Sequence, residues 1–237
     1  QNMKSLFGKI LRIDPLGNNA PNGKYGIPAS NPFVGRSGKR GEIYAYGLRN
    51  PQRFTWDSKD GRMYVADIGQ KQIEEISEVT AGANLGWSVW EGSFKYVNRQ
   101  VDLDNPRSGK GMTWPIVEYD HRDRLLQGVV AITGIVIYRS DEIASLRNLM
   151  IFGDNPSGEI FYIDADRQPS GGHDAIRRIL LKHGDARKTL LQTIRERNAA
   201  QGKKPAARAD LRFGSDHAGR IYLLNKYDGV VRLLVPE

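Results

Sequence analysis

The chain has 237 residues, a length that suits one large domain or two small ones. It contains no cysteine, which excludes disulfides, zinc–thiolate sites and a cysteine nucleophile. The formal net charge of +8 would suit nucleic acid, an anionic membrane or an acidic protein, but it also fits an ordinary surface rich in lysine and arginine. No apolar run approaches the roughly 20 residues that a spanning helix needs, so we expect no membrane span.

Short strands separated by tight turns are predicted along most of the chain, and the many glycines and prolines favour an all-β architecture. A lone strand is predicted at Gly8–Asp14. Three longer units, at 53–79, 148–164 and 210–235, each have the pattern strand, turn, strand, turn, strand. Repeated antiparallel units of this kind are typical of propeller blades. The lone strand then resembles the closing strand of a blade whose other strands lie upstream.

Two segments differ from these units in composition. Residues 18–39 are rich in glycine, proline, asparagine and serine, which predicts a long surface loop. Residues 174–208 are predicted to be a helical insertion, because Leu190, Leu191 and Ile194 fall at helical spacing. Lysine and arginine crowd this insertion. It is therefore either a solvated rim of the fold or a docking surface for an acidic partner.

The predicted units amount to about three propeller blades and one strand. A blade buries its faces against neighbouring blades, and the ring normally closes on itself. We therefore expect the ring to be completed by upstream blades of a longer protein or by a second chain.

The most informative motifs follow one another closely: Gly47-Leu48-Arg49-Asn50-Pro51-Gln52, Asp67-Ile68-Gly69-Gln70 and Glu74-Glu75. With their neighbours they resemble the cofactor-side blade of the soluble quinoprotein sugar dehydrogenases, the glucose/sorbosone dehydrogenase family. The resemblance runs from Leu6 to Leu234 and is strongest from Glu42 to Trp87. It implies that residues 1–237 are the C-terminal half of a six-bladed β-propeller that holds pyrroloquinoline quinone (PQQ) and calcium.

The same resemblance implies an activity. The intact protein would oxidise the C1 hydroxyl of an aldose sugar to a lactone and pass the electrons to an external acceptor such as a cytochrome. Relatives of this kind are periplasmic or secreted. The alternative is a non-catalytic propeller of the same lineage that serves as a binding module. A nucleic-acid partner is not expected, because no recognised nucleic-acid motif or aromatic-lined groove accompanies the basic charge.

The resemblance also suggests which residues contact the cofactor. Arg49 and Asn50 match the family's Arg-Asn pair, and these side chains can bind a carboxylate and donate to a carbonyl. Tyr96 falls where some relatives place an aromatic contact. Arg208 stands between alanines where relatives have Arg-x-Arg-Asp. Strand alternation would point Arg208 away from the face that positions 207 and 209 occupy.

Calcium ligands are implied in the same way. In the family a Gly-Pro pair offers backbone carbonyls to a calcium beneath the quinone; Gly69 matches the glycine, and Gln70 replaces the proline. Glu75 matches the acidic ligand of a separate structural calcium, to which a backbone carbonyl at the position of Leu85 contributes. Calcium accepts both kinds of oxygen. The alternative for Glu75 and its neighbour Glu74 is an exposed strand edge.

Two departures from the family favour the non-catalytic alternative. One is that the loop Asp154–Gly158 lacks the lysine that some relatives present to the quinone, and the other is that alanine stands at both aligned arginine positions, Ala207 and Ala209. The family's catalytic base is a histidine upstream of the Arg-Asn motif, and no histidine precedes Arg49 here. His121 is interpreted as structural or pocket-lining. We therefore assign no catalytic residue within the chain.

Overall fold

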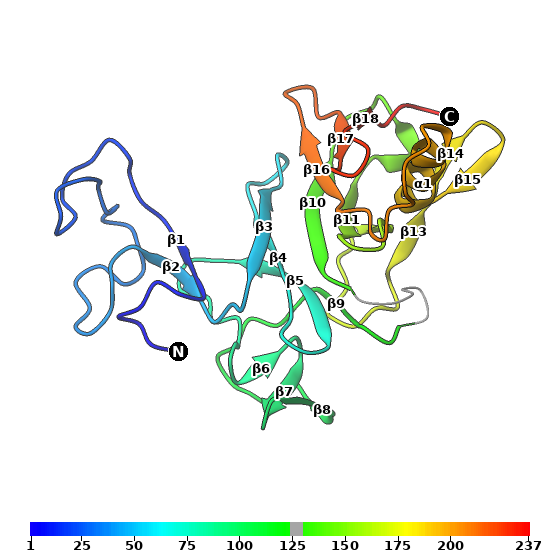
Figure 1. The fold of residues 1–237 in the computed structure, drawn as a ribbon. Coiled ribbons are helices and arrows are strands. Elements are labelled where there is room, and N and C mark those ends of the chain that lie inside the picture. The colour runs from blue at the N-terminus through cyan, green and yellow to red at the C-terminus, as the bar shows by residue number, and fades with distance from the viewer. Residues whose placement is uncertain (124–129) are drawn as a thin grey trace.

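A computed structural model of the chain describes residues 1–123 and 130–237 (Figure 1). The expected all-β class is confirmed in outline, because the described part consists mainly of short antiparallel strands with one α-helix, α1 (Leu190–Ala200), and one 3-10 turn, η1 (Ala144–Leu146). No helix in these ranges is long and apolar enough to cross a membrane.

Three sheets contain the predicted units. Sheet A has the order β3 (Pro51–Trp56), β4 (Met63–Asp67), β5 (Ile73–Val79) and β9 (Val117–Asp120). Sheet B has the order β10 (Ile132–Tyr138), β11 (Leu149–Asp154), β12 (Ile160–Asp164) and β13 (Arg177–Ile179). Sheet C has the order β16 (Arg212–Ser215), β17 (Ile221–Leu224) and β18 (Val231–Leu233). The units at 53–79, 148–164 and 210–235 fall in sheets A, B and C respectively, but the second unit holds two strands, β11 and β12, and not the three predicted, because β10 and β13 complete sheet B from outside it.

Smaller sheets flank these three. They are formed by β1 (Lys9–Leu11) with β2 (Ile43–Tyr46), by β6 (Trp90–Glu91) with β7 (Phe94–Val97) and β8 (Gln100–Pro106), and by β14 (Leu181–His183) with β15 (Ala186–Lys188). The prediction of a lone opening strand was wrong, because β1 pairs with β2 across the loop 18–39. A partner more than 30 residues away leaves no local signal in the sequence.

The segment 174–208 is only partly helical. Its helix begins after Thr189, whose hydroxyl accepts a hydrogen bond of 3.2 Å from the backbone N–H of Gln192, while the Gln192 side chain accepts one of 2.8 Å from the Thr189 N–H. This reciprocal capping box fixes the start of α1. The residues before it extend sheet B as β13 and then form the β14–β15 hairpin, so helical character is confirmed only for Leu190–Ala200.

Buried apolar clusters lie between successive sheets. Tyr64 and Ile76 of sheet A pack with Ile132 and Phe152 of sheet B. Sheet B packs in turn against sheet C and α1, and the other face of sheet A packs against the β1–β2 unit. Face-to-face packing of antiparallel sheets in chain order is how propeller blades pack. In Figure 1 the described sheets form an open arc.

The first strands of sheets A, B and C, namely β3, β10 and β16, lie side by side. Two hydrogen bonds join sheets A and B where these strands begin. Thr133 Oγ1 donates to Gln52 Oε1 at 3.2 Å, and the Ile132 N–H donates to Glu74 Oε2 at 2.8 Å. We call this end of the molecule the site end, because the loops that carry the predicted site residues converge on it.

Candidate functional site

Arg49 lies between β2 and β3, and its side chain reaches the turn that joins β4 to β5. Its Nη1 donates to the backbone oxygens of Gly69 at 2.8 Å and Ile68 at 3.2 Å, and its Nε donates to Gln70 Oε1 at 3.1 Å. The structure therefore brings together Arg49, Gly69 and Gln70, which come from separate motifs. Two carbonyl oxygens that converge on one cationic nitrogen form a position suited to a cation.

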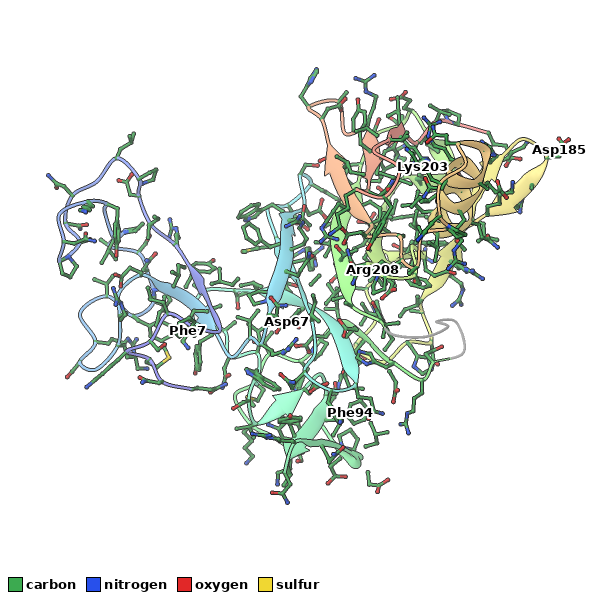
Figure 2. All side chains as sticks on the ribbon, viewed as in Figure 1. Phe7, Asp67, Phe94, Asp185, Lys203 and Arg208 are labelled. Atoms are coloured by element: carbon green, nitrogen blue, oxygen red, sulfur yellow. The ribbon has the colours of Figure 1, made fainter. Side chains whose placement is uncertain are left out.

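Asp67 fixes the backbone beside this position. Its carboxylate oxygens accept hydrogen bonds from the N–H groups of Arg49 at 2.9 Å and Asn50 at 2.6 Å. Asn50 itself has an exposed side chain at the start of β3. Burial raises the pKa of Asp67 to about 7. Figure 2 shows Asp67 at the end of β4. No role was predicted for Asp67 from the sequence, although its position two residues before Gly69 in the quoted motif is a signal that points to it.

Glu91 of β6 holds the opposite side of the same turn. Its Oε1 accepts hydrogen bonds of 2.6–2.9 Å from the backbone N–H groups of residues 71–73. A side chain at position 69 would not fit, because a Cβ there would lie 1.9 Å from the oxygen of Ile73. The turn 68–73 is therefore clamped between Arg49 on its carbonyl side and Glu91 on its amide side. Glu91 comes from a distant strand, so no local pattern predicted this role.

A row of buried carboxylates crosses sheet A next to the turn. Asp67 of β4 is paired with Glu75 of β5, which is paired with Glu118 of β9. Glu118 accepts a hydrogen bond of 2.6 Å from the Ser93 N–H. Glu75 Oε2 is buried without a hydrogen-bond partner among the described residues. Burial, followed by the charges of Asp67 and Glu118, raises the pKa of Glu75 well above its usual range. An exposed strand edge is thereby excluded for Glu75.

The surroundings of Glu75 fit a bound cation. A buried carboxylate oxygen without a donor must take up a proton or face a cation, and calcium accepts such oxygens. Alternation along β5 places Glu75 on the same face as Val79, which packs with Leu85 in the cluster beside β2. No group of three or more acidic or histidine side chains in the described ranges is placed to hold a metal. A calcium here would therefore need backbone oxygens as well, such as the carbonyl of Leu85 that the family resemblance implies.

Glu74 points to the other face of sheet A and joins it to sheet B. The carboxylate is fully buried; Oε1 lies 2.8 Å from His121 Nε2, and Oε2 accepts from Ile132. This excludes an exposed strand edge for Glu74 as well. The contact agrees with the structural interpretation of His121.

Arg208 approaches the site end from the segment before β16, and Figure 2 shows it near sheet B. Its guanidinium contacts Asn155 Oδ1 in the loop that lacks the family's lysine, and it lies 3.6 Å from Asp210. The alternation argument does not apply, because β16 begins only at Arg212 and Asp210 adopts a φ of 55°. The structure therefore brings Arg208 to the loop Asp154–Gly158.

Tyr96 of β7 is half-buried, with its ring against Trp87 at a centroid distance of 5.0 Å. The Trp87 N–H donates to the oxygen of Gly47 at 2.9 Å, two residues before Arg49. Trp87 thus connects Tyr96 to the turn that carries Arg49. No hydrogen bond joins Tyr96 to Arg49 directly among the described residues.

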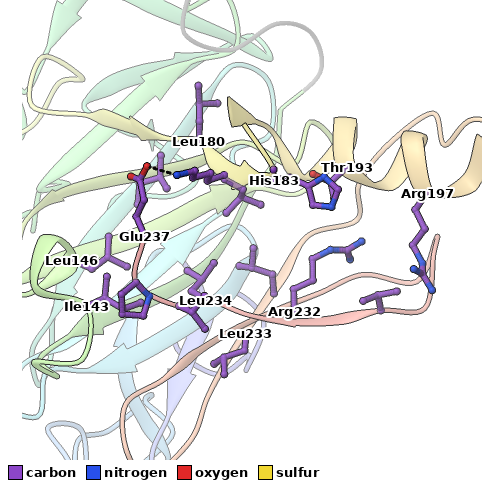
Figure 3. Close-up of a pocket in the computed structure, with 18 of the residues that line it drawn as sticks. Ile143, Leu146, Leu180, His183, Thr193, Arg197, Arg232, Leu233, Leu234 and Glu237 are labelled. Atoms are coloured by element: carbon purple, nitrogen blue, oxygen red, sulfur yellow. Dashed lines mark hydrogen bonds and ion pairs between the residues drawn. The ribbon is translucent and has the colours of Figure 1, made fainter. Parts of the chain in front are cut away.

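A separate groove of about 1010 Å³ lies away from these residues (Figure 3). It is formed by the β14–β15 hairpin, α1 and the chain after β18. Leu146 and Leu234 line the groove, as do Lys182 and Glu237, which form an ion pair at 2.9 Å. None of the predicted site residues lines this groove.

The antiparallel sheets stack in chain order, and loops whose carbonyl oxygens suit a cation lie together at one end. These features define a propeller-type protein with a candidate cofactor site. Residues 1–222 match the family described as Glucose / Sorbosone dehydrogenase, and the chain belongs to that family.

Individual relatives agree with this assignment. The chain is 30% identical over 248 residues to the HIPL2 protein of Arabidopsis thaliana, covering 100% of this chain and 35% of that protein. It is 25% identical to the aldose sugar dehydrogenase YliI of Escherichia coli, covering 65% of this chain and 37% of that enzyme. The aligned segments therefore cover little more than a third of the length of each of these relatives.

Solved structures show a similar fold. The apo form of the soluble aldose sugar dehydrogenase from Escherichia coli matches with a TM-score of 0.63 at 20% identity, covering 98% of this chain and 55% of that one. The PQQ-bound aldose sugar dehydrogenase from Streptomyces coelicolor matches with a TM-score of 0.53 at 21% identity, covering 97% and 49%. The chain thus corresponds to about half of each of these propeller-type dehydrogenases.

Proposed function

We propose that the protein is a PQQ-dependent dehydrogenase that oxidises the C1 hydroxyl of an aldose sugar to a lactone. Residues 1–237 would form part of a six-bladed propeller and supply the side that holds the cofactor and calcium. The observation that carries this proposal is the convergence of Arg49 with the carbonyl oxygens of Ile68 and Gly69. This convergence supports a cation position beside an arginine suited to a carboxylate, and the PQQ-bound aldose sugar dehydrogenase with a similar fold supports PQQ as the cofactor.

The proposed roles follow from the chemistry of each side chain. Arg49 and Arg208 supply positive charge for the cofactor's carboxylates, and the exposed amide of Asn50 donates to a carbonyl. Tyr96 offers an aromatic face. Arg208 is a reasonable substitute for the absent lysine, because it contacts the loop in which some relatives carry that lysine.

Calcium would be held at two positions. Gly69 and Gln70 would offer backbone oxygens beneath the cofactor, while Glu75 and the carbonyl of Leu85 would hold the structural ion. Bound PQQ would supply a two-electron acceptor for the sugar. We propose that the histidine that takes the proton from the C1 hydroxyl lies in upstream blades or a second chain, and that the protein is periplasmic or secreted, as the family resemblance implies.

Titration of PQQ into the calcium-loaded protein tests this function. Calorimetry should show saturable binding, and Arg49→Ala should weaken it by about 10- to 100-fold, since a hydrogen-bonded charge contributes roughly 1.5–3 kcal/mol. Arg53→Ala is the matched control, because Arg53 lies on β3 with an exposed side chain whose one hydrogen bond among the described residues goes to the oxygen of Gln52. Equal losses in both variants would contradict the assignment of Arg49.

A non-catalytic propeller that serves as a binding module is the second candidate. The observation that favours it is the environment of Ala209, which is fully buried in the cluster between sheets B and C. A position where relatives carry an arginine has become part of the apolar core here, so that part of the anion clamp is lost. A folded protein that binds calcium and sugar but no PQQ would favour this candidate.

We also propose that the electron acceptor is an acidic protein, such as a cytochrome with an acidic face, that docks on segment 174–208. This segment carries ten lysines and arginines against three acidic residues, so it holds +7 of the chain's net charge of +8. Figure 2 shows Asp185 and Lys203, which belong to this segment, on the same side of the molecule. Concentrated charge of one sign accelerates association with a partner of the other sign.

The combined change of Lys203→Glu and Lys204→Glu should slow reduction of an acidic acceptor by about tenfold at low salt. Both side chains are exposed, so folding should be unaffected. The difference should shrink as salt screens the charges. Reduction of a small neutral dye serves as the control and should not change. An unchanged rate with the acidic acceptor would exclude this surface.

A further inference from the structure

We infer that Arg49 and calcium compete for the backbone oxygen of Gly69, and that metal binding releases the Arg49 side chain toward the cofactor. This inference rests on the proposed function, since it concerns how that site is loaded. It gives Arg49 two successive partners: the turn 68–73 first, and an anionic group of the cofactor once calcium has taken its place.

The competition follows from the contacts of one nitrogen. Arg49 Nη1 lies 2.8 Å from the Gly69 oxygen and 3.2 Å from the Ile68 oxygen, so it sits where both carbonyl dipoles converge. Calcium binds oxygens at about 2.3–2.6 Å. A calcium on the Gly69 oxygen would therefore lie within about 5 Å of Nη1, and two positive charges at this separation repel each other. Both cations cannot occupy the position.

Arg49 is also able to leave. All its described side-chain hydrogen bonds go to neutral oxygens, those of Ile68, Gly69 and Gln70. Among the described residues its guanidinium forms no ion pair, because Asp67 accepts from the backbone N–H of Arg49 and not from the side chain. Hydrogen bonds between a guanidinium and a carboxylate are stronger than those to a neutral oxygen. A cofactor carboxylate is therefore the better partner.

The exchange need not disturb the backbone. Glu91 fixes residues 71–73 from the amide side of the turn, and Asp67 fixes the N–H groups of Arg49 and Asn50. The carbonyl oxygens would stay in place while one half-exposed side chain rotates. Calcium binding and cofactor binding are then coupled through Arg49, and by linkage each favours the other.

The test measures calcium affinity in the absence of PQQ, using Arg49→Met, which keeps the length of the side chain without its charge. We expect the variant to bind calcium at the turn about tenfold more tightly than the unmodified protein. Arg53→Met should leave the calcium affinity unchanged. Arg49→Lys retains the positive charge, so its calcium affinity should be closer to that of the unmodified protein than to that of Arg49→Met. Measurements in a Glu75→Gln background separate this site from the second calcium position.

Calcium affinity that is unchanged or weaker in Arg49→Met, together with lost PQQ binding, would overturn the competition but leave the proposed function standing. If the unmodified protein binds neither calcium nor PQQ, the proposed function itself fails. Arg49→Gln, which keeps hydrogen-bond donors but no charge, gives a second reading if the methionine variant does not fold. It should also bind calcium more tightly, and an unchanged affinity would count against the inference.

Discussion

Glu75→Gln is expected to stabilise the calcium-free protein and to remove the part of its stabilisation by calcium that comes from the structural ion at Glu75. Glu75 is buried, its Oε2 has no partner in the described part of the chain, and Asp67 and Glu118 stand on either side. A buried polar group without a partner costs about 1–3 kcal/mol, and a charged one costs more. Glutamine removes the like-charge repulsion, and its amide can donate to the neighbouring carboxylates, so the free energy of unfolding should rise by about that amount.

The pH dependence has a defined sign. Burial raises the pKa of Asp67 from 3.8 to about 7, and it raises the pKa of Glu75 well above 4.5. A carboxyl group with a raised folded-state pKa contributes stability below its unfolded pKa and loses that contribution as the pH rises through its folded pKa. The calcium-free protein should therefore lose stability from about pH 4 to pH 7, and Glu75→Gln should reduce this loss.

Thermal unfolding from pH 4 to 8, with excess chelator or with calcium, measures both effects. Calcium at about 100 times the Kd of the Glu75 position should stabilise the unmodified protein by about 2.7 kcal/mol through that position, and the variant should lack this contribution. Glu78→Gln is the matched control, because Glu78 lies on the same strand but is half-exposed and 3.8 Å from Arg62. A variant that keeps the full gain from calcium would show that Glu75 is not a ligand.

Gly69→Ala is expected to abolish cofactor and calcium binding at the turn. A Cβ at this position would lie 1.9 Å from the Ile73 oxygen and 2.9 Å from Glu91 Oε1. The Ile73 oxygen belongs to the backbone, so no side-chain movement can relieve the 1.9 Å contact. The turn must open, which separates the Gly69 oxygen from Arg49. We expect PQQ affinity to fall at least tenfold and stability to fall by about 1–3 kcal/mol, as for other overpacked sites.

Gly214→Ala provides the comparison for this substitution. Gly214 lies in β16, and an added Cβ would meet nothing closer than Leu224 Cδ1 at 3.5 Å, an ordinary contact. Its PQQ affinity should match that of the unmodified protein, measured by the same calorimetric titration. Normal binding by Gly69→Ala would show that the turn 68–73 does not form the cofactor site.

Local patterns in the sequence were sufficient to predict the strands β3, β4 and β5. Apolar alternation and the Asp60-Gly61 turn act between neighbours in the chain, so they are visible without a structure. The strands β9 and β13 were not predicted, because each joins its sheet only after a long excursion of the chain. The helix was predicted too broadly, since the same basic composition suits both the β14–β15 hairpin and α1.

The motifs in the sequence by themselves determined the family and identified Arg49, Gly69, Gln70 and Glu75 as site residues to test, because residue type and spacing are preserved along the chain. Only the tertiary structure decided what these residues contact. Asp67, Glu91 and Glu118 act on the site through pairings between distant strands, which no spacing records. Groups that are removed from water must find their hydrogen-bond partners within the fold. Only the fold shows that Glu75 Oε2 is buried without such a partner among the described residues and that Arg49 donates to the Gly69 oxygen in the turn 68–73.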